Sequence, residues 1–218
     1  MITLYHCEGA RSFRPLWMLE EMGLPYELKM LPFPPRVLAK DYLGINPLGT
    51  IPFLIDGETR MSESSGICHY LGIRHGPTPL MVGPEDPAYG AFLNWMYFSD
   101  ATLTFPQTLV LRYAQLEPEE RRNPQVAGDY AKWFLGRLRV VEAALANAET
   151  LCGGRFTAAD IVIGYALRLA NAIGLAKDFG PNVAAYWARL QQREGYGRAV
   201  AAERKAGVEQ NVPPRVRA

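Results

Sequence analysis

Residues 46–71 read NPLGTIPFLIDGETRMSESSGICHYL, and the pattern of this stretch decides the fold. Residues 51–55 form an apolar run, which Asp56-Gly57 follows directly. Because an Asp-Gly pair after such a run favours a tight hairpin, we predict two short antiparallel strands here. From Ile67 the apolar side chains recur at helical spacing, after serines of the kind that cap helices. The stretch therefore predicts a loop, a hairpin and the beginning of a helix.

The sequence before this stretch alternates strand and helix patterns. We expect a strand at 2–6, a helix that begins near Ser12 and ends at Gly23, a strand at 26–30 and an irregular helix at 37–43. With the hairpin and its helix, these elements give the order βαβαββα. If the first two strands are parallel, their crossover is right-handed. This order predicts an α/β domain with a thioredoxin-like fold.

Composition and periodicity change after this domain. Residues 76–87 contain four prolines and two glycines, and only helical periodicity follows them. We therefore predict a thioredoxin-like domain at 1–78, a linker at 79–86 and an all-helical bundle at 87–218. A long helix should open at Pro87 and kink or end at Pro106. From Gly207 we expect a mobile tail that includes Pro213-Pro214.

A helix-start motif lies inside the predicted bundle. Thr157 can cap a helix, Asp160 at the third helical position can bond back to the cap, and Phe156 can pack on Ile161. This capping box predicts a helix from about residue 158, and a change in the box should affect folding before chemistry.

Charge and cysteine usage exclude several classes of protein. The 218 residues carry a formal net charge of +1, which argues against a nucleic-acid surface or an anionic-membrane surface. No stretch is long and apolar enough for a membrane span, and no secretory signal precedes the first strand. The three cysteines and three histidines show no disulfide framework and no metal-ligand spacing. We expect a cytoplasmic protein without a metal.

Two short motifs resemble those of the glutathione transferase family. In that family a cis-proline follows an Asn-Pro-x-x-x-[Ile/Val]-Pro segment, as at 46–52 here, and a Glu-Ser pair opens the next helix, as at Glu63-Ser64. The helix-start motif and the patterns at 181–187 and 196–199 extend the resemblance over about residues 2–204. The resemblance implies that the backbone of Ile51, before Pro52, pairs with the cysteinyl part of glutathione. It also implies that Ser64 with Glu63 holds the γ-glutamyl end.

Three residues are candidates to activate the glutathione thiol. Ser12, at the expected start of the first helix, has a hydroxyl that could donate to the sulfur, although it is equally suited to capping the helix. Tyr5 matches the position of a catalytic tyrosine in some classes of the family, but it also suits a core. Arg11 matches a thiolate-stabilising arginine. The sequence departs from the serine-using classes, whose serine falls at Ala10, and from the cysteine-using class.

The remaining substrate contacts are less specific. Lys40 is the best candidate for the cation that binds the glycyl carboxylate of glutathione. An apolar cleft should receive the second substrate, although aromatic residues at helical spacing are often core residues. The aromatic candidates for this acceptor pocket are Trp95, Phe98, Phe105 and Tyr113.

The sequence therefore predicts a homodimeric detoxification enzyme with glutathione as co-substrate. It would conjugate the thiolate to an electrophilic, apolar small molecule or use it to reduce a peroxide. One alternative is a non-catalytic module of the same fold that binds a ligand or a protein. A specialised glutathione-dependent isomerase or dehalogenase is another, since the residues that distinguish them lie in the acceptor pocket.

Overall fold

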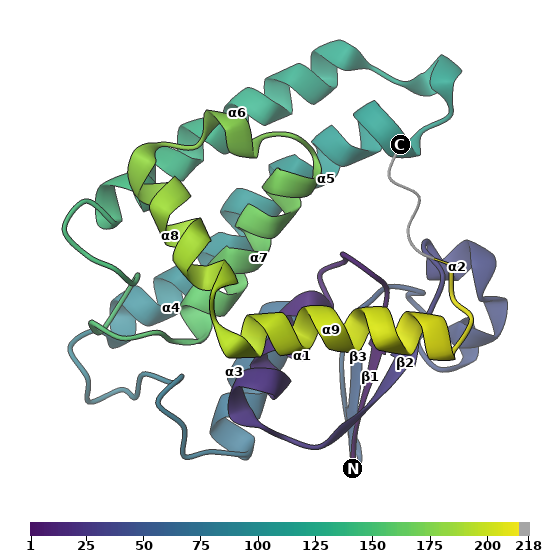
Figure 1. Cartoon of the computed structure of the whole chain (residues 1–218). Coiled ribbons are helices and arrows are strands. Elements are labelled where there is room, and N and C mark those ends of the chain that lie inside the picture. Colours follow the sequence, from purple (N-terminus) through teal and green to yellow (C-terminus); the bar gives the residue numbers. More distant parts are fainter. Residues whose placement is uncertain (214–218) are drawn as a thin grey trace. The chain divides into compact units, whose positions relative to one another are not determined.

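A computed structural model describes residues 1–213, which form two compact units (Figure 1). One unit comprises Met1–Thr78 together with residues 191–213, and the other comprises Pro79–Leu190. By its contacts the last helix thus belongs with the first unit, whereas the sequence boundaries place it in the helical bundle. The predicted domains 1–78 and 87–218 remain a proposal about which segments fold independently.

The first unit has the βαβαββα order, which confirms the predicted thioredoxin-like fold. The Asp56-Gly57 hairpin and the helix end at Gly23, which has a φ of 63°, form where the sequence predicts them. The elements in chain order are β1 (Ile2–His6), α1 (Phe13–Met22), β2 (Tyr26–Met30), α2 (Pro35–Leu38), the 3₁₀ helix η1 (Lys40–Gly44), β3 (Phe53–Asp56), β4 (Thr59–Met61) and α3 (Ser64–Arg74).

The four strands form one sheet in the order β2-β1-β3-β4. β1 runs parallel to β2, with His6 opposite Met30, and antiparallel to β3, with Tyr5 opposite Phe53. The ends of β1 and β2 and the beginning of β3 therefore meet at one edge of the sheet. The segments that leave this edge carry most of the candidate site residues.

The final helix, α9 (Glu194–Glu209), packs beside α1 and reaches β2 (Figure 1). The ring of Tyr196 meets that of Trp17 edge-on at 5.1 Å, and the Arg193 guanidinium donates to both Glu21 carboxylate oxygens at 2.8 and 2.9 Å. Because α9 continues to Glu209, Gly207 lies within a helix, and the tail predicted from Gly207 begins later. Residues 214–218 lie outside the described part of the chain.

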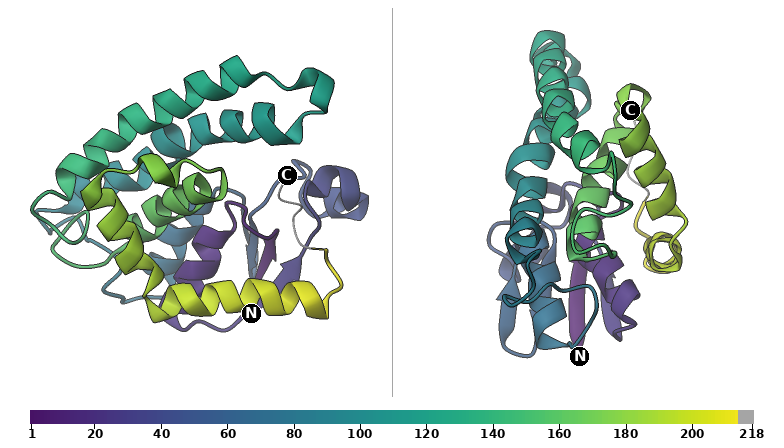
Figure 2. Two further views of the ribbon diagram at one scale, coloured as in Figure 1. Left: turned by 45° about the horizontal axis from the view of Figure 1, so that its top comes forward. Right: turned by 90° about the vertical axis from the view of Figure 1, so that its left-hand side faces the viewer.

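The second unit is helical, as predicted for the bundle, and α5 and α6 lie side by side in it (Figure 2). The helix α7, which the capping box opens, is buried almost all round, so it forms the centre of this unit. The main helices and π-helical turns in chain order are α4 (Tyr89–Phe98), η2 (Ser99–Thr104), α5 (Phe105–Leu111), η3 (Arg112–Leu116), α6 (Pro124–Ala144), α7 (Ala158–Ala172) and α8 (Pro181–Gln191), with short 3₁₀ helices at η4 (Glu119–Arg121) and η5 (Ala176–Asp178).

The first helix of this unit differs from the prediction at its beginning. It begins at Tyr89 rather than Pro87, because the Asp86 carboxylate accepts from the backbone N–H of Ala88 at 2.9 Å and forms a turn before it. Of the two outcomes predicted at Pro106, a kink or an end, the helical run does not end there. The π-helical turn η2 precedes Pro106, so the proline stands in a first turn, where no N–H is needed.

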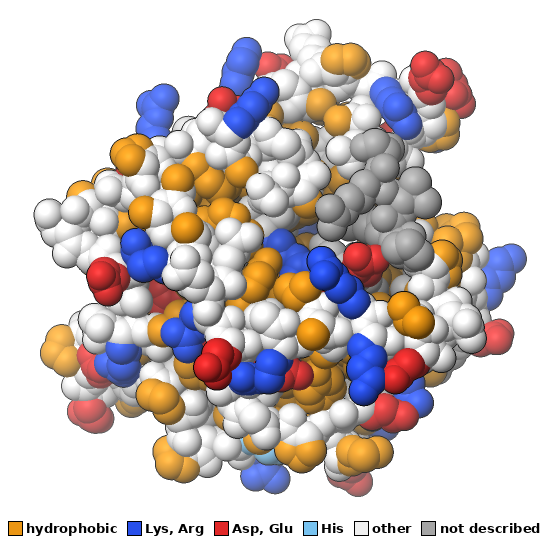
Figure 3. All heavy atoms as spheres, viewed as in Figure 1, with side chains coloured by type: hydrophobic (Ala, Val, Ile, Leu, Met, Phe, Trp, Pro, Cys, Tyr) orange, Lys and Arg blue, Asp and Glu red, His pale blue; other side chains and the backbone are white. Residues whose placement is uncertain are grey.

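Within residues 1–213, no helix is long and apolar enough to span a membrane. Basic and acidic side chains are interspersed over the face of the molecule in Figure 3, as a net charge of +1 leads us to expect.

Candidate functional site

The backbone before β3 lies at the edge where β1 and β2 end. The Ile51-Pro52 peptide bond is cis, and the pairing of β3 with β1 begins at Phe53. Ile51 therefore stands just beyond the ladder and is partly exposed, while Pro52 is buried. An extended peptide can pair with such a segment through backbone hydrogen bonds.

Two side chains fix the loop that leads to Ile51. The Thr50 carbonyl accepts from the Tyr42 hydroxyl at 2.7 Å and from the Asn46 side-chain amide at 2.8 Å. Asn46 is only 2% exposed. Burial raises the pKa of Tyr42 to about 12, so the hydroxyl remains a donor over the whole physiological range. Asn46, the first residue of the Asn-Pro motif, thus holds the backbone of this loop in place.

The N-terminus of α3 provides the second part of the candidate site. Ser64 is the first residue of the helix, and Glu63, exposed to solvent, takes the cap position that the sequence suggests for a serine. N–H groups in a first helical turn lack intrahelical acceptors and favour a carboxylate ligand. Both residues implied for the γ-glutamyl end therefore stand at a helix end suited to an anion.

A buried arginine supports Ser64 from inside the unit. The Arg14 guanidinium donates to the Ser64 hydroxyl oxygen at 2.9 Å, and the exposed fractions of the two residues are 0% and 3%. A hydrogen bond from a charged donor is stronger than a neutral one, so Arg14 fixes the orientation of Ser64. Sequence reasoning missed this residue. The sequence did carry a signal for Arg14, because it lies among the apolar residues of the predicted first helix.

The loop between β1 and α1 carries two of the candidates for thiol activation. Ser12 is fully buried at the N-cap of α1, and its side chain makes no capping hydrogen bond. Its hydroxyl oxygen accepts from the backbone N–H of Cys7 at 3.4 Å, which ties the two ends of the loop together. Arg11, the neighbouring candidate, is partly exposed.

The third candidate, Tyr5, is partly exposed and belongs to an aromatic cluster beside the sheet. Its ring lies 5.3 Å from that of Tyr42 and 6.4 Å from that of Phe53, measured between centroids. These contacts match the alternative interpretation of Tyr5 as a packing residue.

Two exposed basic residues lie in the segment of the chain that leads to Ile51. Lys40 is exposed at the beginning of η1. Arg36, on α2, is also exposed, and its Cβ lies 2.6 Å from where a Cβ on Gly49 would stand. Gly49 has a φ of +59°, so this close approach requires glycine. The structure thus adds Arg36 to Lys40 as a candidate cation. The sequence did not indicate Arg36, because helix α2, which carries it, has only four residues and gives no helical pattern.

The four aromatic candidates for the acceptor pocket are spread along the helical run from α4 to η3. Trp95 is buried and packs edge-on against Phe98 at 5.4 Å. Phe105 is 49% exposed and contacts Tyr130, whereas Tyr113 is partly covered by Arg112, 5.5 Å from its ring. The ring contacts therefore join Trp95 to Phe98 but leave Phe105 and Tyr113 in separate groups.

The described cysteines and potential metal ligands form neither a disulfide nor a metal-binding group. Cys7, Cys68 and Cys152 are buried and form no disulfide. In the described residues, no group of three or more His, Cys, Asp or Glu side chains is arranged to hold a metal ion.

Comparison with known proteins gives a consistent result for both units. Residues 10–73 match the family described as "Glutathione S-transferase, N-terminal domain", and residues 132–194 match "Glutathione S-transferase, C-terminal domain". Glutathione S-transferase 3 of Schizosaccharomyces pombe is 36% identical, and the match covers 73% of this chain and 70% of that protein. Glutathione S-transferase hmp2 of Hypomyces subiculosus is 31% identical, and the match covers 94% of this chain and 100% of that protein.

The fold is also found in solved structures. The glutathione transferase URE2P6 from Phanerochaete chrysosporium, crystallised in complex with oxidized glutathione, superposes with a TM-score of 0.81. It is 26% identical, and the match covers 94% of this chain and 97% of that one.

Proposed function

This chain belongs to the glutathione S-transferase family, and we propose that it activates the thiol of glutathione for transfer to an electrophilic, apolar small molecule or for peroxide reduction. The observation that carries the proposal is the N-terminus of α3, where buried Arg14 holds Ser64 at 2.9 Å. This helix end suits the γ-glutamyl carboxylate, and Glu63 beside it suits the α-ammonium group.

The cysteinyl part of glutathione would pair with the backbone of Ile51, before Pro52. The Thr50 carbonyl is already held by Tyr42 and Asn46, so little conformational freedom is lost when the peptide binds. Lys40 or Arg36 would bind the glycyl carboxylate, since both are exposed cations in the segment that leads to this loop, and Arg36 lies against Gly49 within it.

Activation of the thiol requires stabilisation of the thiolate. A free thiol has a pKa near 8.5, and lowering it by about two units requires roughly 2.7 kcal/mol in favour of the thiolate. We assign the main contribution to Arg11, which is partly exposed and charged. Ser12 is fully buried, so its part is to hold the loop that presents Arg11, and Tyr5 would contribute from the adjoining strand.

The chemistry follows from a positioned thiolate. In conjugation the sulfur attacks an electrophilic carbon, a C–S bond forms, and the leaving group departs with its electron pair. In peroxide reduction the sulfur attacks one oxygen, the O–O bond breaks, and the other oxygen leaves with the electron pair as an alkoxide or hydroxide, which takes up a proton to give an alcohol or water. The resulting sulfenic acid is reduced by a second glutathione, which gives the disulfide and water.

The aromatic residues Trp95, Phe98, Phe105 and Tyr113 remain candidates for contact with the second substrate. We also propose that the enzyme is a cytoplasmic homodimer with a role in detoxification, as the family resemblance implies. Sedimentation equilibrium tests the oligomeric state, and a monomer mass would refute the dimer.

A substrate assay tests the transferase proposal. We expect wild-type enzyme to conjugate glutathione to 1-chloro-2,4-dinitrobenzene, measured by absorbance of the thioether. In Ser64→Ala, KM for glutathione should rise about tenfold with a smaller change in kcat, because a ground-state binding contact is lost. Ser62→Ala, in the segment before α3, is the matched control and should leave KM unchanged.

Peroxide reduction is measured in parallel, by oxidation of glutathione with cumene hydroperoxide. If glutathione binds but neither reaction exceeds the uncatalysed rate, the non-catalytic ligand-binding alternative replaces the proposed activity. If glutathione does not bind, the assigned site is wrong.

A further inference from the structure

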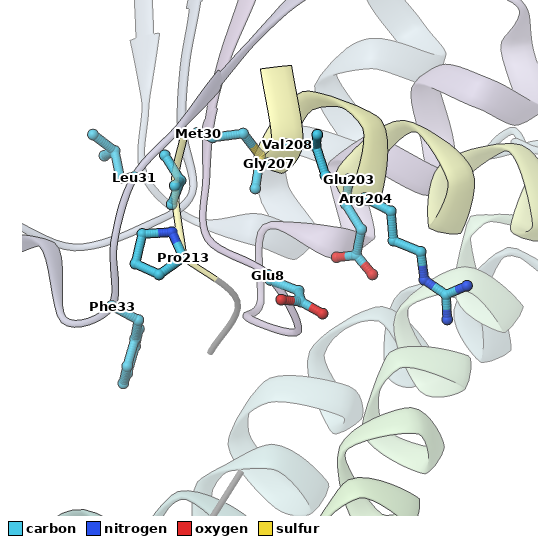
Figure 4. A pocket seen from close by; sticks show the side chains of 10 residues that line it. Glu8, Met30, Leu31, Phe33, Glu203, Arg204, Gly207, Val208 and Pro213 are labelled. Carbon is cyan, nitrogen blue, oxygen red and sulfur yellow. The ribbon is translucent and has the colours of Figure 1, made fainter. Parts of the chain in front are cut away.

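The helix α9 contributes a buried carboxyl group to the loop that carries Arg11. Glu203 lies on this helix and is 2% exposed. Figure 4 looks into a pocket that Glu8 and Glu203 both line, and it shows the Glu203 side chain directed from α9 toward the loop after β1, where Glu8 lies. A helix far along the chain thus reaches the segment to which we assign stabilisation of the thiolate.

The loop after β1 forms a tight turn, and Glu203 bonds to it. The Ala10 N–H donates to the Cys7 carbonyl at 3.1 Å, and Gly9 has a φ of +66°, which favours glycine in a turn. Because the bond that closes the turn uses the N–H of Ala10, the N–H of Gly9 can donate to a group outside the turn. One oxygen of Glu203 accepts from it at 3.3 Å.

The same oxygen of Glu203 also contacts the end of β1. It lies 3.1 Å from Nε2 of His6, a residue that is 0% exposed. Since a carboxylate oxygen is an acceptor, we assign the ring proton to Nε2. Within residues 1–213 the buried Nδ1 of His6 has no hydrogen-bond partner, which fits this tautomer because Nδ1 then carries no proton. Glu203 therefore holds both the strand that the loop leaves and the turn within the loop.

α9 is attached to the first unit by other contacts at both of its ends. Before its first turn, the Arg193 guanidinium donates to both carboxylate oxygens of Glu21. After its last turn, the side-chain oxygen of Gln210 accepts from the Met30 backbone N–H at 2.8 Å. The helix is thus docked independently of Glu203, and it provides a fixed support from which the Glu203 carboxyl group can hold the loop.

We infer that Glu203 is a positioning residue for thiol activation. It fixes the turn at Gly9, so that Arg11, two residues later, is held where it stabilises the thiolate. The inference rests on the proposed function, in which Arg11 supplies the positive charge. Glu203 acts through the backbone of the loop rather than through its own charge, because a carboxylate that acted on the sulfur by charge would disfavour the thiolate.

Glu203→Met tests the inference, because methionine keeps the volume of the side chain and removes both oxygens. The thiol pKa of bound glutathione should rise by about one unit, and kcat for conjugation at pH 6.5 should fall about fivefold with the thiolate fraction. Kd for glutathione at that pH should change less than about threefold, because the contacts at Ile51 and Ser64 remain. Amide hydrogen exchange should be faster in residues 7–12, where the turn has lost its acceptor.

Two further variants separate positioning from charge and from general loss of stability. Glu203→Gln keeps an acceptor oxygen without the charge, so the thiol pKa should stay near that of the wild type. If Glu203 acted by its charge, the pKa would fall in both Glu203 variants. Gln210→Ala loosens α9 from β2 without touching the loop, and it should lower Tm but leave the thiol pKa unchanged. Thermal unfolding monitors all variants, and Glu203→Leu replaces Glu203→Met if methionine prevents folding.

The outcomes distinguish this inference from the proposed function. A lowered thiol pKa in the wild type that persists in Glu203→Met would overturn the inference and leave the proposed function intact. An equal rise of the pKa in Gln210→Ala would also overturn it, because any loosening of α9 would then have the same effect. An unshifted thiol pKa in the wild type would refute the proposed function, and the inference would fall with it.

Discussion

Arg14→Met is expected to weaken glutathione binding by about 10- to 100-fold, although Arg14 is fully buried. The guanidinium donates to the Ser64 hydroxyl oxygen at 2.9 Å, and hydrogen bonds from charged groups contribute roughly 1.5 to 3 kcal/mol. Without it, the hydroxyl loses its orientation and the first turn of α3 loses a nearby positive charge. Titration calorimetry with glutathione measures the loss.

A double-mutant cycle distinguishes an effect through Ser64 from general damage. If Arg14 acts through Ser64, the loss in Arg14→Met with Ser64→Ala should be much smaller than the sum of the two single losses. Arg14→Lys keeps the charge without the planar guanidinium and should recover only part of the affinity. Additive losses would show that Arg14 affects glutathione by another route.

Asp160→Ala should lower the free energy of unfolding by about 3 to 5 kcal/mol, the largest stability effect that we expect from one residue. The Asp160 carboxylate accepts from the Thr157 and Leu151 backbone N–H groups at 2.8 and 3.1 Å and from the Tyr186 hydroxyl at 2.7 Å. The Thr157 hydroxyl also donates to this carboxylate at 3.1 Å, so alanine would leave four buried donors without their acceptor. Urea unfolding monitored by circular dichroism measures the difference.

Asp160→Asn is the matched control, because its amide oxygen can still accept from Leu151 and Tyr186, and it should lose less stability. Asp129→Ala removes an exposed carboxylate from α6 and should have almost no effect. Burial raises the pKa of Asp160 above its ordinary value, so ionisation of this group opposes folding. Its contribution to stability is therefore complete below the ordinary carboxyl pKa and falls as the pH rises through the raised value, a pH dependence that Asp160→Ala should lack. A loss of under 1 kcal/mol in Asp160→Ala would contradict this role.

Local patterns predicted most of the secondary structure because the relevant forces act between neighbours in sequence. The Asp-Gly turn, the glycine at the end of α1 and the Thr157-Asp160 box each specify their own backbone, and all three form as predicted. The order of strands and helices along the first unit also followed from these local patterns, whereas the order of the strands in the sheet comes from the structure. The π-helical turn before Pro106 was not predicted, because such a turn leaves no marked sequence pattern.

The parts of the site that the sequence missed depend on contacts between distant segments. Arg14 and Ser64 are 50 residues apart, and His6 and Glu203 are 197 residues apart. Ser12 stands at the predicted helix start, but its burial follows from the fold of the loop, which its residue type does not reveal. Arg36 became a candidate only when its helix was found against Gly49.

The most direct test of the account is a titration of the thiol of bound glutathione, followed through the ultraviolet absorbance of the thiolate. The account predicts a pKa about two units below the free value near 8.5 in the wild type, and a return toward that value in Arg11→Ala. Ser12→Ala, measured beside it, should give a smaller shift. Glutathione that binds with an unshifted thiol pKa in the wild type would contradict the claim that this protein activates the thiol.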